Sequence, residues 1–144
     1  ELNGQQKRIK LVKAAVGSKR GSIILDPSIE STSATSLIAS EKGERVPIVT
    51  VQDILRKYRV KKPVLKMDVE GFEYEILLNT ANECLSRFGE IILEYHYGHR
   101  NLCEKLHSAG FETELLGKPM IGYNKQSKDK IMVGGIIYAK RKKG

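Results

Sequence analysis

The chain has 144 residues, of which 40% are hydrophobic and 29% charged, with 13 glycines and 4 prolines. This balance is typical of a globular domain and excludes an intrinsically disordered chain and collagen-like repeats. No apolar run approaches the roughly 18 residues that a membrane-spanning helix needs. The formal net charge is +8, but no aromatic residues interleave with its basic runs, so we favour solvated faces over a nucleic-acid-binding surface.

The two cysteines, Cys84 and Cys103, lack the spacing of a zinc site or a disulfide framework. We therefore expect reduced thiols. Because residues 1–13 are polar rather than signal-like, we also expect a cytoplasmic protein that does not contact a membrane.

One domain is expected over residues 1–144. The Leu-Asn-Gly sequence at 2–4 is typical of the end of a helix, so we expect this domain to be truncated at its amino terminus.

The first third of the chain predicts short strands. Aliphatic residues at 9–16 and 22–25 predict two strands around a turn. The Ser/Thr-rich residues 31–40 predict a loop, and residues 46–50 predict a third strand.

A helix is predicted directly after this third strand. Thr50 and Asp53 have the spacing of a capping box, and Pro63 would follow the helix end. The apolar residues at helical spacing, which predict its buried side, are Val51, Ile54, Leu55 and Tyr58.

The rest of the chain predicts strands that alternate with helices. Strands are expected at 64–69 and 90–97, and a helix at 101–109 that ends at Gly110. Between the two strands, one face of a helix would carry Tyr74, Leu77, Leu78, Ala81 and Leu85.

Two strands, at 111–116 and 131–140, would close the domain as an antiparallel pair, with Gly134-Gly135 marking a bulge or a close backbone approach. The whole pattern predicts an α/β fold with a mostly parallel sheet.

Two of the predicted strands carry charged residues where a buried strand should be apolar. Lys66, Asp68 and Glu70 alternate and share one face, and Glu94 and His96 share another. A lone buried ion is costly, so these residues must have partners or lie at an opening. Because ligands bind at the carboxyl edge of strands in open α/β sheets, we predict an active-site crevice there. An internal pair between Lys66 and a carboxylate is the alternative.

This set of side chains allows two kinds of chemistry. His96 or a carboxylate can act as a general base that removes a proton from a hydroxyl or an amine. The carboxylates and the imidazole can instead hold a divalent cation. Both alternatives stay open.

The sequence at 65–73, Leu-Lys-Met-Asp-Val-Glu-Gly-Phe-Glu, resembles the FkbM family of methyltransferases, whose hallmark is a Leu-Lys-Ile-Asp-Val-Glu-Gly segment on the fourth strand. Further resemblances follow in family order: Ala-Ala-Val-Gly at 14–17, Val-Pro-Ile-Val-Thr-Val-Gln-Asp at 46–53 and Ile-Leu-Glu-Tyr-His at 92–96. With residues 2–4, they span essentially the whole chain.

The resemblance implies a Rossmann-like class I methyltransferase fold, S-adenosylmethionine as the methyl donor, and O-methylation of a small molecule or sugar. It places Ala14 and Ala15 beside the adenine of the cofactor, and Asp68 beside the point of methyl transfer. The residues that it places in the catalytic site, at the ends of two strands, are Asp68, Glu70, Glu94 and His96.

In this family a strand and a Gly-rich turn bind the methionine end of the cofactor, and we expect both upstream of Glu1. The chain would then need its upstream part for activity. The open sheet edge predicts a homo-oligomer. Two other functions remain as alternatives: a basic nucleic-acid-binding module, and a metal-dependent hydrolase that uses the same charged residues.

Overall fold

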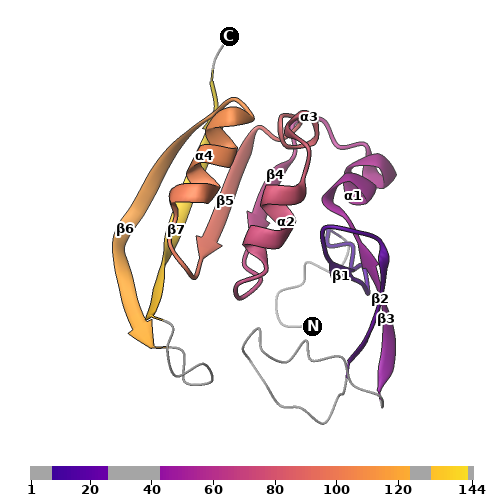
Figure 1. Cartoon of the computed structure of the whole chain (residues 1–144). Coiled ribbons are helices and arrows are strands. Elements are labelled where there is room, and N and C mark those ends of the chain that lie inside the picture. Colours follow the sequence, from indigo (N-terminus) through magenta and orange to yellow (C-terminus); the bar gives the residue numbers. More distant parts are fainter. Residues whose placement is uncertain (1–7, 26–42, 124–130, 143–144) are drawn as a thin grey trace.

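The computed structural model describes residues 8–25, 43–123 and 131–142 (Figure 1). The elements in the first half of the chain are β1 (Ala15–Val16), β2 (Gly21–Leu25), β3 (Glu44–Val49), α1 (Val51–Tyr58) and β4 (Val64–Met67). Those in the second half are α2 (Glu73–Asn79), α3 (Asn82–Leu85), β5 (Glu90–Tyr95), α4 (Arg100–Ser108), β6 (Phe111–Tyr123) and β7 (Ile131–Arg141).

The strands form two mixed sheets, one ordered β1-β3-β2 and the other β4-β5-β7-β6. β1 runs parallel to β3 and β4 parallel to β5, while the other three pairings of the described strands are antiparallel. The α/β class and the antiparallel pair at the carboxyl end are therefore confirmed. The expectation of a mostly parallel sheet is wrong for the described residues, because β7 inserts between β5 and β6 and runs opposite to both.

Helix α1 begins and ends as its sequence predicts. The Thr50 side chain accepts a hydrogen bond from the backbone of Asp53, and the Asp53 side chain accepts one from the backbone of Thr50, which completes the capping box. Asp53 also pairs with Arg20 in the turn before β2. The helix ends at Arg59, which adopts the left-handed conformation, before Pro63 is reached. Val51 on its inner side is buried.

The continuous helical face predicted as far as Leu85 is divided between α2 and α3. Thr80 adopts an extended conformation after α2, and α3 begins at Asn82. Leu77 is buried as expected, but Leu78 is 38% exposed. The prediction of one long face is therefore wrong, since the chain turns before that face is complete.

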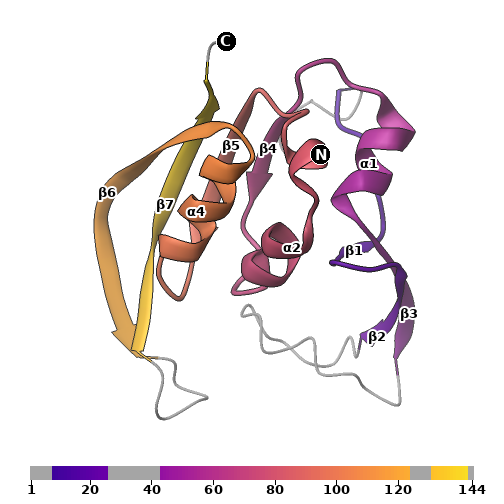
Figure 2. The same cartoon turned by 45° about the horizontal axis from the view of Figure 1, so that its top comes forward.

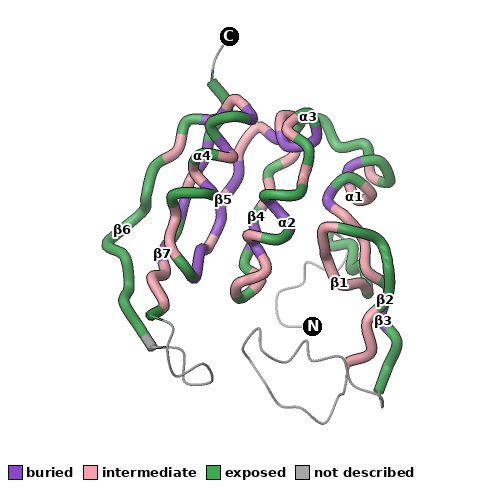
Figure 3. The backbone as a smooth tube through the Cα atoms, viewed as in Figure 1, coloured by how far each residue is buried: buried purple, intermediate pink, exposed green. Residues whose placement is uncertain are grey.

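Helices α2 and α4 lie on the same face of the larger sheet (Figure 1, Figure 2). The core contains residues of these helices and of the sheet strands β5 and β7. Alternate residues of β5 belong to this core, and Ile91, Leu93 and Tyr95 are almost fully buried (purple in Figure 3). One apolar cluster extends from α1 to β7. Cys84 and Cys103 are free thiols, as their spacing predicts.

Gly135 in β7 lies directly against the ring of Tyr95, its partner in the sheet. A Cβ atom at Gly135 would lie 2.5 Å from the Tyr95 hydroxyl oxygen, and one at Gly134 would lie 3.2 Å from the Tyr95 backbone oxygen. The close backbone approach predicted for these glycines is confirmed.

The amino-terminal strand is shorter than predicted. Only Ala15–Val16 pairs within the predicted range 9–16 that the structure describes, and Ile9 and Leu11 are 67% and 89% exposed. The expected helix end at 2–4 and the loop at 31–40 lie outside the described residues. In the described part of the chain, no helix has the length and apolar character to cross a membrane.

Candidate active site

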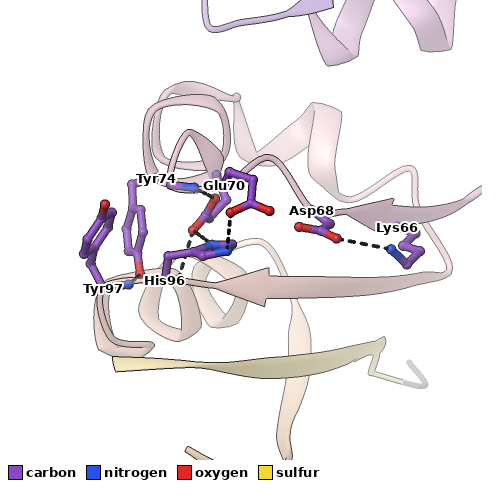
Figure 4. A network of polar contacts seen from close by, with 8 residues as sticks. Lys66, Asp68, Glu70, Tyr74, His96 and Tyr97 are labelled. Carbon is purple, nitrogen blue, oxygen red and sulfur yellow. Dashed lines mark hydrogen bonds and ion pairs between the residues drawn. The ribbon is translucent and has the colours of Figure 1, made fainter. Parts of the chain in front are cut away.

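Polar side chains gather where β4 and β5 end and α2 begins (Figure 4). The chain leaves β4 through a sharp turn, in which Glu70 and Gly71 both have positive φ angles, of 52° and 104°. A Cβ atom at Gly71 would lie 2.9 Å from the Tyr97 ring, so both the conformation and the space require glycine. This turn directs Glu70 toward the end of β5.

The centre of the site is a pair formed by Glu73 and His96. Glu73 is the first residue of α2 and is fully buried, and His96 is 8% exposed. One Glu73 oxygen, Oε1, accepts a hydrogen bond from the backbone N–H of His96 at 3.1 Å and lies 2.8 Å from its ring Nδ1. The other, Oε2, accepts from the backbone N–H of Gly71 at 2.8 Å. A carboxylate only accepts, so Nδ1 carries the proton, which makes Nε2 of the neutral ring an acceptor.

The Nε2 atom of His96 faces two further carboxylates. It lies 3.4 Å from Glu70 Oε2, and the ligand atoms of Asp68, Glu70 and His96 all lie within 4.8 Å of one another. Asp68 and Glu70 are exposed, whereas His96 is buried, so a fixed imidazole stands behind two carboxylates that solvent can reach. Such a cluster can accept a proton from a hydroxyl or hold a cation.

The structure brings together three of the four predicted catalytic residues. Asp68, Glu70 and His96 form the cluster, whereas Glu94 lies two residues earlier on β5 and is not part of it. Strand alternation predicts a shared face for Glu94 and His96, but His96 follows the last paired residue of β5, so the alternation no longer fixes its direction.

Lys66 does not occupy a buried position. Its ammonium group lies 3.8 Å from Asp68 Oδ2, but the Lys66 side chain is 72% exposed. β4 is an edge strand of its sheet, so its outward residues remain in water. The strand is therefore not buried on both sides, as a central parallel strand would be, and the Lys66–Asp68 pair is not the internal pair given as the alternative but a solvent-screened contact of small energy.

Sequence reasoning missed the structural role of Glu73, which it named only as the last residue of the family-like segment at 65–73. Glu73, Ile76 and Leu77 fall at i, i+3 and i+4 and form the buried side of α2. A single carboxylate on an apolar helix face is the signal that could have revealed this role.

Tyr74 was also missed as a polar contact and was predicted as an apolar position. Its hydroxyl donates to the backbone oxygen of Gly98 at 2.6 Å and accepts from the backbone N–H of Tyr97 at 2.7 Å (Figure 4). These bonds hold the segment that follows His96 against α2. Burial raises the pKa of Tyr74 to about 12, so the hydroxyl keeps its proton at neutral pH.

A largely apolar cleft of about 420 Å³ borders the cluster. It lies between α1 and β4, and Val16, Leu55, Met67 and Asp68 are among its lining residues. Asp68 therefore belongs to both the cleft and the cluster. Ala14 and Ala15, which the resemblance places beside the adenine, are half-buried and are not among the residues that line this cleft, whereas the next residue, Val16, does line it.

Comparison with known proteins gives a consistent result. The family model described as methyltransferase FkbM domain matches residues 2–113. The chain is also 27% identical, over 107 residues, to the hexuronic acid methyltransferase AglP of Haloferax volcanii. That match covers 72% of this chain but 44% of the relative, so the chain spans less than half the length of the protein that it matches. No solved structure matches.

Proposed function

Because the chain belongs to the methyltransferase FkbM domain family, we propose that it forms the acceptor side of an S-adenosylmethionine-dependent enzyme that methylates oxygen of a sugar or another small molecule. The match favours this function over nucleic-acid binding and over metal-dependent hydrolysis. In this proposal the larger sheet corresponds to one half of a Rossmann-like class I methyltransferase sheet.

The observation that carries the proposal is the position of Asp68. It lines the apolar cleft and also belongs to the cluster with Glu70 and His96. A methyltransferase needs such a junction, because the methyl donor and the acceptor must meet at one point. Asp68 lies at the carboxyl end of β4, which is where ligands bind in α/β sheets.

The cleft fits part of the cofactor. Apolar side chains such as Val16 and Met67 offer a wall for the adenine ring, and the Asp68 carboxylate offers an acceptor for hydroxyl or ammonium groups. Ala14 and Ala15 precede Val16 at the edge of this wall. When bound, the cofactor supplies an electrophilic methyl group.

The cluster provides what an acceptor hydroxyl needs. Methylation of oxygen requires that the hydroxyl lose its proton, and the His96 Nε2 lone pair and the carboxylates of Asp68 and Glu70 converge on one solvent-accessible point. Glu73 fixes the ring, so Nε2 is held in place before the acceptor arrives. Positioned proton acceptors of this kind contribute about 10²–10⁴-fold to a rate.

A sugar acid is the substrate class that the comparisons support, since the matched relative is a hexuronic acid methyltransferase. The net charge of +8 agrees with an acidic acceptor, because a positive protein attracts anions from a distance. This substrate class is tested with hexuronic acids and their neutral hexose counterparts as a matched pair.

The test uses the complete protein in which this chain occurs. Calorimetry should show binding of S-adenosylmethionine and of its demethylated product, and mass spectrometry should show transfer of one methyl group to the acceptor. His96→Gln should reduce kcat by about 10²–10⁴-fold while cofactor binding persists, because the loss concerns proton removal. A complete protein that binds neither form of the cofactor would rule out the proposal.

A further inference from the structure

We propose that Asp68, Glu70 and His96 together bind one divalent metal cation, of which Mn²⁺ is the best match. The inference goes beyond the proposed function, because ion binding is a property of this cluster and does not depend on methyl transfer.

The positions of the three residues agree with a shared ion. Metal–ligand bonds are about 2.0–2.2 Å long, so two ligand atoms on one ion lie roughly 3–4.4 Å apart. His96 Nε2 and Glu70 Oε2 are 3.4 Å apart, and no two ligand atoms of the cluster are separated by more than 4.8 Å. Small rotations of the exposed Asp68 and Glu70 side chains bring the widest distance into range.

The Glu73–His96 pair is the independent observation that points to an ion. Histidines that bind metals almost always donate their other ring N–H to a carboxylate or a carbonyl group, which fixes the tautomer and directs the free nitrogen at the metal. Here Nδ1 lies 2.8 Å from the fully buried carboxylate of Glu73, and Nε2 faces Glu70 Oε2 at 3.4 Å. The His96 side chain is 10% exposed, so its ring is held in one orientation beside the two carboxylates.

The charges of the cluster fit a divalent ion. Without a cation, the carboxylates of Asp68 and Glu70 lie close together and repel each other. A 2+ ion balances two carboxylates and accepts the imidazole as a neutral ligand. Among the described residues, Lys66 is a basic side chain that contacts the cluster. Its ammonium lies 3.8 Å from Asp68 Oδ2, and its side chain is largely in water.

The ligand types favour Mn²⁺ among common cations. Imidazole is a ligand of transition metals rather than of Ca²⁺ or Mg²⁺, whereas a majority of carboxylates suits Mn²⁺. Asp68 and Glu70 are open to solvent, so further positions on the ion are accessible to water or to a substrate oxygen. If the proposed function is also correct, His96 Nε2 would bind the ion instead of taking the proton itself, and the ion would bind the acceptor hydroxyl and lower its pKa.

The first experiment measures ion binding by the chain without any activity assay. A tag-free chain treated with a chelator is titrated with MnCl₂, and free Mn²⁺ is followed by electron paramagnetic resonance. One ion should bind per chain. No binding at Mn²⁺ concentrations up to about 1 mM, the weak limit of functional cation sites, would overturn the proposal.

Ring-nitrogen NMR of the wild-type chain assigns the site without a variant. Zn²⁺, a diamagnetic substitute, should shift the Nε2 resonance of His96. The ring resonances of His107 should stay unchanged, since His107 lies near the end of α4, outside the cluster, and its Nε2 contacts the Thr113 hydroxyl. Shifts at His107 with none at His96 would show that the ion binds elsewhere and would refute the assignment.

Variants then test each ligand against a matched carboxylate. Asp68→Asn and Glu70→Gln should each weaken Mn²⁺ binding by at least about tenfold, and Glu73→Gln by about 10–100-fold through loss of the ring's orientation. Glu94→Gln, which changes a carboxylate of β5 that lies outside the cluster, should bind as the wild type does. Equal affinities in all four variants would overturn the proposal.

Methyl transfer without ion binding would leave the proposed function intact and reject this inference alone.

Discussion

A single oxygen atom of Glu73 holds His96 at two points, because Oε1 contacts both the backbone N–H and the ring Nδ1 of that residue, at 3.1 and 2.8 Å. The second oxygen holds the backbone of Gly71. One buried carboxylate thereby joins the turn after β4, the start of α2 and the end of β5. Each of its bonds satisfies a polar group that would otherwise be buried without a partner, so the fold and the site depend on the same side chain.

Glu73→Gln should destabilise the chain by about 1–3 kcal/mol. Glutamine has one acceptor oxygen in place of two, so either Gly71 N–H or the two donors of His96 lose their acceptor, and the new amide N–H₂ faces another donor. Urea denaturation followed by circular dichroism measures the change.

Glu75→Gln is the control, because Glu75 lies on the exposed side of the same helix and bonds Ser18 at the surface. Its effect should stay within about 0.5 kcal/mol. Equal losses of stability in the two variants would show that general charge at the start of α2, not the buried bonds of Glu73, is what matters.

Gly135→Ala should destabilise the chain by about 1–3 kcal/mol through overpacking. Its new methyl group would lie 2.5 Å from the Tyr95 hydroxyl oxygen, and Tyr95 is only 1% exposed. Gly122→Ala, in the neighbouring strand β6, adds the same methyl group with nothing within 4 Å and should be close to neutral. Thermal unfolding of the two variants side by side is the measurement, and identical melting temperatures would contradict the packing argument.

Local signals in the sequence predicted most elements of the described fold. The capping box of Thr50 and Asp53 fixed the start of α1, and the residues at 90–97 predicted a strand where β5 lies. The sheet order could not be predicted in the same way. It depends on β7 pairing with β5 as well as with β6, which is a choice between distant segments that no local pattern encodes.

The candidate site was predicted in part, for a related reason. Asp68, Glu70 and His96 follow strands whose ends meet, and the sequence locates those ends. Glu94 was included because strand alternation pairs it with His96, but the strand ends between them. Glu73 was missed because its role requires the distance between α2 and β5, which only the packed helix supplies.

Self-association is a prediction that follows from β4, whose outer edge pairs with no other described strand. Val64 on this edge strand is 60% exposed and borders the apolar cleft. We expect a homodimer at micromolar concentration, and Val64→Lys should weaken it, since a charge on an edge opposes strand pairing. Sedimentation velocity is the test. Ile121→Lys, on the opposite edge strand β6, is the control and should leave the dimer intact; a wild-type monomer would reject the prediction.

Alkaline titration should distinguish Tyr74 from the other tyrosines. Burial raises the pKa of its hydroxyl from 10 to about 12, so the folded state holds this proton more tightly than the unfolded state does. The resulting stabilisation is complete below pH 10 and is lost as the pH rises toward 12. Burial also raises the pKa values of Tyr95 and Tyr138, so absorbance of tyrosinate should show one late-ionising group fewer in Tyr74→Phe than in the wild-type chain. The phenylalanine variant should also lose the bonds to Gly98 and Tyr97, and its stability should fall less steeply between pH 10 and pH 12 than that of the wild type. Parallel stability curves for the two proteins over that range would show that Tyr74 is not the group whose ionisation is coupled to unfolding.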